Sequence, residues 1–134
     1  MGAATNSGDE ILAAELLTDP SGPVICAVRG EVDMSNADEL SVYLDSAFKA
    51  GPDVVVDLSG VTFLASAGVR VLLKAYTDRR GRRIAIVTNA AIEAVLRICG
   101  LTAVVPCRPT RSLAVRELVR SASAASGDGS PPVG

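Results

Sequence analysis

The chain contains no histidine, and this absence restricts the chemistry that it could perform. Without an imidazole base, neither a Ser-His-Asp nor a Cys-His nucleophile can be assembled, and the commonest zinc and iron ligand sets are incomplete. The phosphate-binding loops G-x-x-x-x-G-K-[ST] and G-x-G-x-x-G are missing as well. We therefore expect a protein that is not an enzyme and that uses neither a metal ion nor a cofactor.

Other features are scarce too. Aromatic residues make up 3% of the chain and tryptophan is absent, so the core must be built from Val, Leu, Ile and Ala. The net charge of −2 provides no basic surface for nucleic acid. No apolar run approaches the roughly 20 residues of a membrane helix, and residues 1–10 do not resemble a signal peptide. The cysteines, Cys26, Cys99 and Cys107, form no C-x-x-C pair. We expect a cytoplasmic protein with reduced thiols, no nucleic-acid partner and no membrane insertion.

The composition that is present suits one globular domain. The chain has 134 residues, of which 49% are apolar and 21% charged. Residues 1–9 are small and polar, and residues 121–134 (SASAASGDGSPPVG) are rich in Ser, Gly, Pro and Ala. We predict a flexible N-terminus over 1–9, a folded domain over 10–120 and a disordered tail over 121–134.

Within the domain, short apolar runs alternate with segments of helical periodicity. Turn residues at 18–22 separate two apolar runs, which predicts an initial β-hairpin. The predicted strands are 11–17, 24–29, 54–58, 84–87 and 104–105. Such an order of elements predicts an α/β fold with a mixed, mostly parallel sheet of four to five strands. One face should be covered more fully than the other.

About four helices are expected between and after these strands. Three of them are predicted to end at Gly51, Gly81 and Gly100, where a glycine stops the helix. The first should begin at a capping box formed by Asn36 and Glu39, and the last at Thr110.

The segment from Asp57 to Val69, DLSGVTFLASAGV, leads from a buried strand into the second helix. Binding sites of open α/β sheets lie at the carboxyl ends of strands, so this segment is well placed for function. Ser66 stands where an N-cap hydroxyl would bond the free amides of the helix, and the residues alone leave open whether it is only a cap. Asp57 likewise either caps the following turn or serves the site.

This segment resembles the D-L-S-x-V-x-F-x-x-S-x-G signature of STAS domains, specifically of the bacterial anti-sigma factor antagonists. The strand that ends in Gly30-Glu31-Val32-Asp33 is similar to the second strand of that family, and Gly100-Leu101 matches the residues after its third helix. The resemblance spans roughly residues 12 to 119 in the expected order. It implies the STAS fold.

The resemblance also implies a function. An antagonist of this family binds an anti-sigma factor of kinase-like ATPase fold and so frees a sigma factor. The partner phosphorylates a Ser or Thr immediately before the motif glycine, and the modified domain dissociates. The phosphate adds about −1.5 to −2 charges, which the helix N-terminus tolerates while the interface does not. The residues predicted to bind the partner are Asp33, Asp57, Ser59, Thr62, Ser66, Ala67, Gly68, Val69 and Arg70. Of these, Arg70 lies off the apolar stripe of its helix and either contacts an acidic partner surface or simply faces solvent.

The sequence departs from the family pattern at the acceptor. Ala67 occupies the usual acceptor position and has no hydroxyl, and Ala65 replaces an acidic residue. Ser66 is therefore the phosphorylation candidate, as a displaced acceptor; otherwise the domain is a phosphorylation-independent antagonist. Asp33 is either part of the docking site or a turn and capping residue.

A second function remains open, that of a STAS accessory subunit in a lipid-transporting ABC system, where the domain docks on an ATPase subunit. A hydrolase that uses Ser66 is disfavoured, because no base is placed beside it. In either binding role we expect a monomer or a weak dimer.

Overall fold

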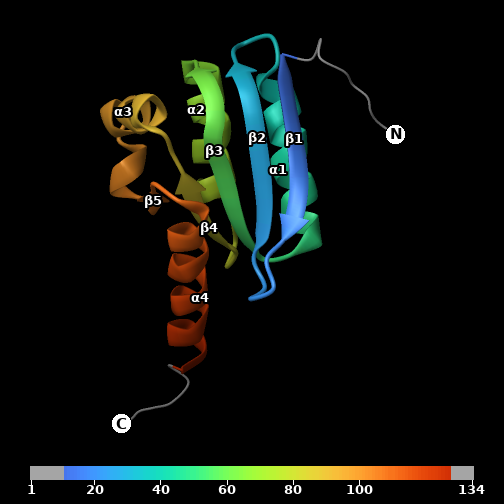
Figure 1. The fold of residues 1–134 in the computed structure, drawn as a ribbon, viewed down its shortest axis with the longest axis vertical. Coiled ribbons are helices and arrows are strands. Elements are labelled where there is room, and N and C mark those ends of the chain that lie inside the picture. Colours follow the sequence, from blue (N-terminus) through green and yellow to red (C-terminus); the bar gives the residue numbers. More distant parts are fainter. Residues whose placement is uncertain (1–10, 128–134) are drawn as a thin grey trace.

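The computed structural model describes residues 11–127, with side chains as far as residue 124 (Figure 1). The predicted flexible segment 1–9 and the end of the predicted tail, from residue 128 on, lie outside the described residues. The elements are β1 (Leu12–Thr18), β2 (Val24–Val32), α1 (Ala37–Ala50), β3 (Asp53–Leu64), α2 (Ser66–Thr77), β4 (Arg83–Val87), α3 (Ala90–Ile98), a 3-10 turn (Leu101–Ala103), β5 (Cys107–Arg108) and α4 (Arg111–Gly127).

Within residues 11–127, the strands form one five-stranded sheet in the order β1-β2-β3-β4-β5. β1 pairs with β2 in antiparallel orientation, and every later pair is parallel. The predicted α/β class, the mixed and mostly parallel sheet and the initial hairpin are confirmed. Among the described helices, none is long and apolar enough to span a membrane.

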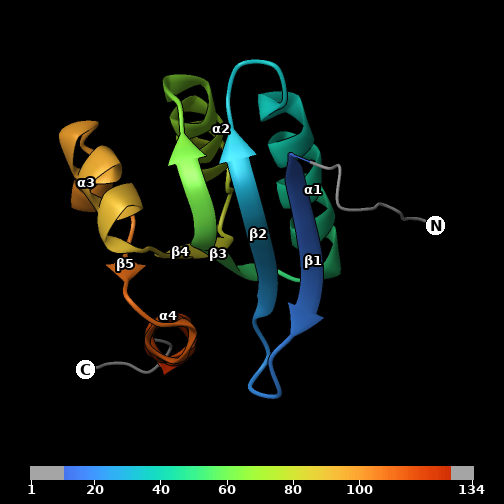
Figure 2. The same cartoon turned by 45° about the horizontal axis from the view of Figure 1, so that its top comes forward.

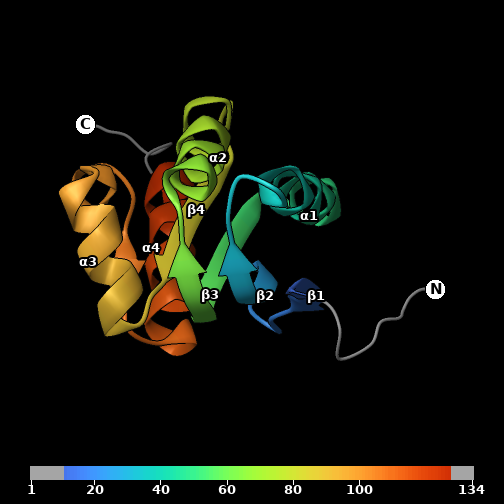
Figure 3. The ribbon, with the colours of Figure 1, turned by 90° about the horizontal axis from the view of Figure 1, so that it is seen from above.

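The helices divide between the two faces of the sheet (Figure 3). Val54 and Val56 of β3 face the cluster to which α1, α2 and α3 contribute. Val55, between them, points to the opposite face, where α4 packs with Ala114 and Leu118. β3 is therefore buried on both sides, which explains its unbroken run of valines. As predicted, one face is covered more fully than the other.

β1 and β2 form the initial hairpin (Figure 2), and a glycine lies at the end of their ladder, where Gly30 pairs with Leu12. Gly30 has a φ of 108°, and a Cβ added there would lie 1.9 Å from the carbonyl oxygen of Ile11. That oxygen accepts a hydrogen bond from the Glu31 N–H. Only glycine combines this left-handed backbone with so close an approach of the neighbouring strand. The glycine of the Gly-Glu-Val-Asp sequence is thus required by the fold.

Two predicted boundaries around β3 and α2 were wrong. β3 continues to Leu64, because β2 runs alongside it and pairs Val32 with Leu64. Much of the predicted loop after residue 58 is therefore strand. α2 ends at Thr77 instead of Gly81, because Arg80 and Gly81 both adopt positive φ and form a separate turn after the helix.

The predicted last strand at residues 104–105 was also wrong. The N–H groups of Val104 and Val105 bond back to the Leu101 carbonyl, so these residues close a 3-10 turn and cannot join a ladder. β5 forms instead at Cys107–Arg108, beside β4. Val105 still packs in the core, which accounts for the apolar pattern that suggested a strand.

The structure also corrects the predicted end of the last helix and the predicted cap of the first helix. α4 continues to Gly127, past the predicted domain boundary at residue 120, because 121–127 is rich in alanine, the strongest helix former. At the start of α1, Asn36 occupies the N-cap position, but its side chain makes no capping bond. It accepts from the Asp33 N–H and donates to the Glu31 carbonyl instead, so the predicted capping box does not form.

Candidate functional site

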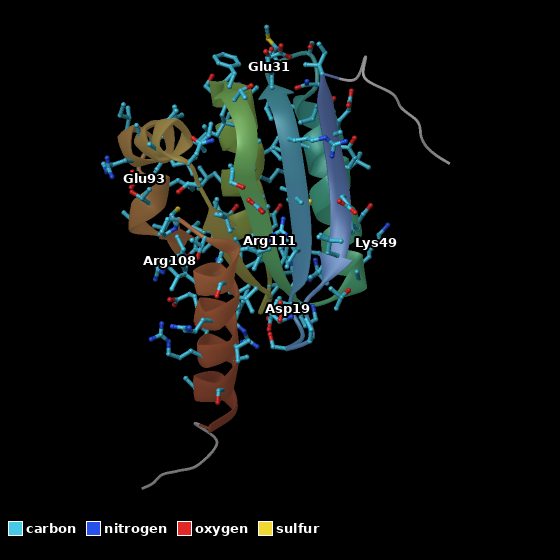
Figure 4. All side chains as sticks on the ribbon, in the orientation of Figure 1. Asp19, Glu31, Lys49, Glu93, Arg108 and Arg111 are labelled. Carbon is cyan, nitrogen blue, oxygen red and sulfur yellow. The ribbon has the colours of Figure 1, made fainter. Side chains whose placement is uncertain are left out.

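The candidate site lies where β2 and β3 end side by side. Phe63 pairs with Glu31 in the parallel ladder, and Figure 4 shows Glu31 at this end of the sheet. The Ala65 N–H donates to the Val32 carbonyl at 2.9 Å, which fixes the turn from β3 into α2 against the end of β2. The loop from β2 into α1 and the first turn of α2 therefore flank one another.

Gly68, the motif glycine, is a packing requirement. A Cβ at this position would lie 2.6 Å from Leu64 Cδ1 and 2.7 Å from Val32 Cγ1, both in the core. Contacts this short force neighbouring side chains to move, which core packing resists. Gly68 thus lets the first turn of α2 rest directly on the strand ends. It is buried, as is the adjacent Val69, so neither presents a side chain to a partner.

Ser66 has a different role from the predicted one. The N-cap of α2 is Ala65, whose carbonyl accepts from the Gly68 and Val69 N–H groups, and no side chain caps the helix. Ser66 is the first helical residue and is exposed. Its hydroxyl has no hydrogen-bond partner among the described residues. The prediction that Ser66 is an N-cap was wrong, and the structure leaves its hydroxyl open to solvent.

Two exposed apolar side chains that sequence reasoning left out of the site lie in the segments that the Ala65–Val32 bond brings together. Met34, in the loop after β2, is 84% exposed, and Phe63, near the end of β3, is 51% exposed. Arg70 is exposed one helical turn after Ser66, at the i+4 position. We call Met34, Phe63, Ser66 and Arg70 the docking surface. Phe63 could have been suspected, because a large aromatic stood inside the motif of a chain with few aromatics.

Asp33 shapes the loop that carries Met34. Its carboxylate accepts hydrogen bonds from the N–H and the hydroxyl of Ser35, and these bonds lower the pKa of Asp33 below its usual value. Of the two roles left open for Asp33, the structure supports the turn residue that positions its neighbours. Thr62 also faces the adjacent strand, with its hydroxyl 3.3 Å from the Gly30 carbonyl.

Asp57 belongs to a different contact on the α4 face of the sheet. Its carboxylate accepts from the Ser59 N–H and hydroxyl, and from Nε and Nη2 of Arg111 at 3.0 and 2.8 Å. Arg111 begins α4, and Figure 4 shows it over the sheet. Burial by itself would raise the pKa of Asp57, but the bonds from Ser59 and Arg111 lower it overall. Asp57 therefore holds α4 on the sheet and is not part of the docking surface.

The predicted site residues are thus separated by the structure. Ser66 and Arg70 lie on the docking surface with Ala67 half-buried between them, whereas Gly68, Val69 and Asp57 are buried. Ser59 is exposed, but it lies beside Asp57 and bonds its carboxylate. Among the described residues, no group of metal-ligating side chains is gathered at this or any other place.

Comparison with known proteins agrees with this geometry. The family model described as "Mlab, STAS domain" matches residues 17–106, which is more than half of the chain. The protein belongs to the STAS-domain family. Its STAS domain thus includes the docking surface, while α4 lies beyond the matched residues. No curated protein matches the sequence significantly.

Solved structures show the same fold for this STAS domain. An anti-sigma factor antagonist from Mycobacterium paratuberculosis is 24% identical with a TM-score of 0.75, over 85% of this chain and 98% of that one. A putative anti-sigma factor antagonist from Thermotoga maritima is 22% identical with a TM-score of 0.70, over 78% and 93%. The phosphorylated form of the Bacillus cell fate determinant SpoIIAA is 17% identical with a TM-score of 0.58, over 78% and 98%. At these identities the likeness establishes the fold.

Proposed function

We propose that this STAS protein is an anti-sigma factor antagonist that binds its partner through the docking surface. The observation that carries the proposal is the exposure of Met34, just after β2, and of Phe63, near the end of β3, where these two strands end as neighbours. Exposed large apolar side chains that gather at a strand end favour a protein interface. The likeness of the fold to that of anti-sigma factor antagonists supports an anti-sigma factor as the partner. The kinase-like ATPase fold of this partner is part of the proposal.

Regulation through Ser66 is the finer part of the proposal. A phosphate on Ser66 would sit at the positive end of the α2 dipole and one turn before Arg70, so the helix would tolerate it. The same charge would lie at the end of the sheet where Met34 and Phe63 are exposed, and would oppose the burial of this region in a complex. Phosphorylation would therefore release the partner without unfolding the domain.

The test uses the anti-sigma factor encoded nearest to this protein. We expect binding by the unmodified protein, and in the presence of ATP the addition of one phosphate that Ser66→Ala abolishes. Ser66→Glu should weaken binding by about tenfold, because it places charge in the interface, whereas Ser66→Ala should stay within about twofold of the wild type. Binding without phosphate would make the protein a phosphorylation-independent antagonist, whose acceptor position is filled by Ala67. No binding by any such partner would overturn the proposal.

A second candidate is the accessory subunit of a lipid-transporting ABC system. The observation that favours it is the matching family model, which is named for Mlab and not for an antagonist. Co-purification with an ABC-type ATPase, in a complex that Phe63→Ser disrupts, would support this role. Co-purification with a sigma-factor regulator would support the first.

A further inference from the structure

A separate crevice lies at the carboxyl ends of β4 and β5. The chain leaves β4 toward α3, whose Ile92 and Leu96 join the cluster with α1 and α2. It leaves β5 toward α4, whose apolar residues pack on the opposite face. Neighbouring parallel strands whose connections diverge in this way open a crevice at their carboxyl ends, where open α/β sheets bind ligands.

The crevice contains a cavity of about 380 Å³ between β4, β5 and the start of α3, which is largely open to solvent. This volume falls within the range of roughly 300–1,000 Å³ that is typical of small-molecule sites. Its wall includes Thr88, Asn89, Ala90, Cys107 and Arg108. The cavity is formed by other elements than the docking surface.

The start of α3 directs free donors toward this space. The Asn89 side chain accepts from the Ile92 N–H and so caps the third residue of the helix. The N–H groups of Ala90 and Ala91 have no acceptor among the described residues. Two unpaired amides at the positive end of a helix favour an anion.

Thr88 supplies an independent indication of a ligand. The residue is 7% exposed, and its hydroxyl makes no hydrogen bond with any described residue. Among the described residues, the fully enclosed side-chain atoms without a hydrogen bond are Asp53 Oδ1 and Arg83 Nε, which form an ion pair at 3.1 Å. The Thr88 hydroxyl is not one of these atoms, so it is not sealed in the core. Thr88 also lines the cavity. A buried hydroxyl is normally bonded, so this donor lacks a partner that a ligand can provide.

The charges around the cavity are compatible with an anion. Glu93 on α3 and Arg108 on β5 both line the cavity, and both are labelled in Figure 4. The Glu93 carboxylate is paired with Arg97, which offsets its charge. The Arg108 guanidinium bonds the Cys107 carbonyl and forms an ion pair with Glu117, which offsets its charge, and it keeps further N–H donors. Burial, followed by the charge of Glu93, raises the pKa of the Cys107 thiol, which stays neutral at pH 7.

We propose that this cavity binds a small organic anion through a carboxylate or phosphate group. The group contacts the Ala90 and Ala91 amides, the Thr88 hydroxyl and the Arg108 guanidinium, and the rest of the ligand fills the cavity. This is a second site of the protein, and it does not depend on the anti-sigma factor role.

The test is a titration of the full chain, followed by amide NMR, with inorganic phosphate, glycerol phosphate and succinate in separate arms. We expect saturable shifts of the Ala90 and Ala91 amides, and the arm with the lowest Kd identifies the head group. Thr88→Val should raise that Kd about tenfold, as expected for a lost bond to a charged group, while Thr88→Ser stays within about twofold. The matched control is Thr77→Val, at the far end of α2, which should leave the Kd unchanged.

Several outcomes would overturn the proposal. One is the absence of saturation in all three arms. Another is an equal shift of the amides at the start of α1, which would show a general response of helix ends to anions. A folded Thr88→Val protein that binds like the wild type would also contradict it. Should Thr88→Val fail to fold, Arg108→Gln decides: an unchanged Kd refutes the site, and a Kd raised about fivefold or more supports it.

Discussion

The contact between Asp57 and Arg111 offers a quantitative test of how α4 is held on the sheet. The change Arg111→Ala leaves the Asp57 carboxylate, whose side chain is 7% exposed, with only Ser59 as a partner. Loss of one partner from a fully buried ion pair costs about 3–5 kcal/mol, and an exposed pair contributes about 0–1 kcal/mol. Because the Arg111 side chain is 44% exposed, we expect an intermediate loss in the free energy of unfolding, about 2 kcal/mol.

The change on the other side of the contact, Asp57→Asn, should lower the free energy of unfolding by less. Asp57→Asn keeps the size of the side chain and an acceptor for Ser59, and the released Arg111 can reach water. We expect a loss of about 1 kcal/mol, and a coupling of about 1 kcal/mol in the double-mutant cycle. Urea unfolding followed by circular dichroism at pH 7 and low salt measures the free energy of unfolding of the wild type, the two single variants and the double variant. A coupling below about 0.3 kcal/mol would refute the claim that this contact fastens α4.

The same contact predicts a dependence on pH. The pKa of Asp57 is lower in the folded protein than the value of about 3.9 in the unfolded chain. The stabilisation is therefore complete above the unfolded pKa and is lost as the pH falls through the folded pKa. The stability of the wild type should fall more steeply below about pH 4 than that of Asp57→Asn. If the stability of the two proteins fell equally with pH, the pKa of Asp57 would be the same in the folded and the unfolded protein, and the prediction would be wrong.

Two further predictions concern glycines and thiols. Gly30→Ala should lower the free energy of unfolding by about 2 kcal/mol or more, because its Cβ would collide with the Ile11 carbonyl. Gly81 also has a positive φ but has open space around it, so Gly81→Ala should lower the free energy of unfolding by only about 1 kcal/mol. Equal losses in urea unfolding would remove the steric argument. Exposed Cys99 should react with a thiol reagent in the native protein, whereas burial raises the pKa of Cys26 to about 11 and should protect it until unfolding. Mass mapping of the labelled cysteines checks this, and early labelling of Cys26 would contradict it.

The fold could be predicted from the sequence where local patterns and packing agree. The spacing of Leu40, Leu44 and Phe48 marks one face of α1, and the structure buries all three. Gly100 follows α3 with a φ of 83°, the left-handed conformation expected at a helix end. In contrast, Val104 and Val105 look like a strand locally, but their N–H groups bond back to the Leu101 carbonyl, and the contact with β4 begins only at the next residue, Pro106.

The site was harder to predict because its contacts join distant residues. Asp57 and Arg111 are 54 residues apart, and no periodicity indicates that they meet. The motif suggested Ser66 as a cap, but the turn is set by the bond of Ala65 to β2, which moves Ser66 into the helix. Phe63 would normally be assigned to the core. Its exposure follows from the extension of β3 beyond β4, which only the register reveals.

The most direct test of the account compares partner affinity at two exposed apolar positions. Phe63 lies on the docking surface, and Ile98, 86% exposed at the end of α3, lies outside it and is the matched control. Calorimetric titration of the anti-sigma factor should give a Kd at least about tenfold higher for Phe63→Ser, and within about twofold of the wild type for Ile98→Ser. Equal affinities for Phe63→Ser and the wild type, with both proteins folded, would place the interface elsewhere and contradict the account.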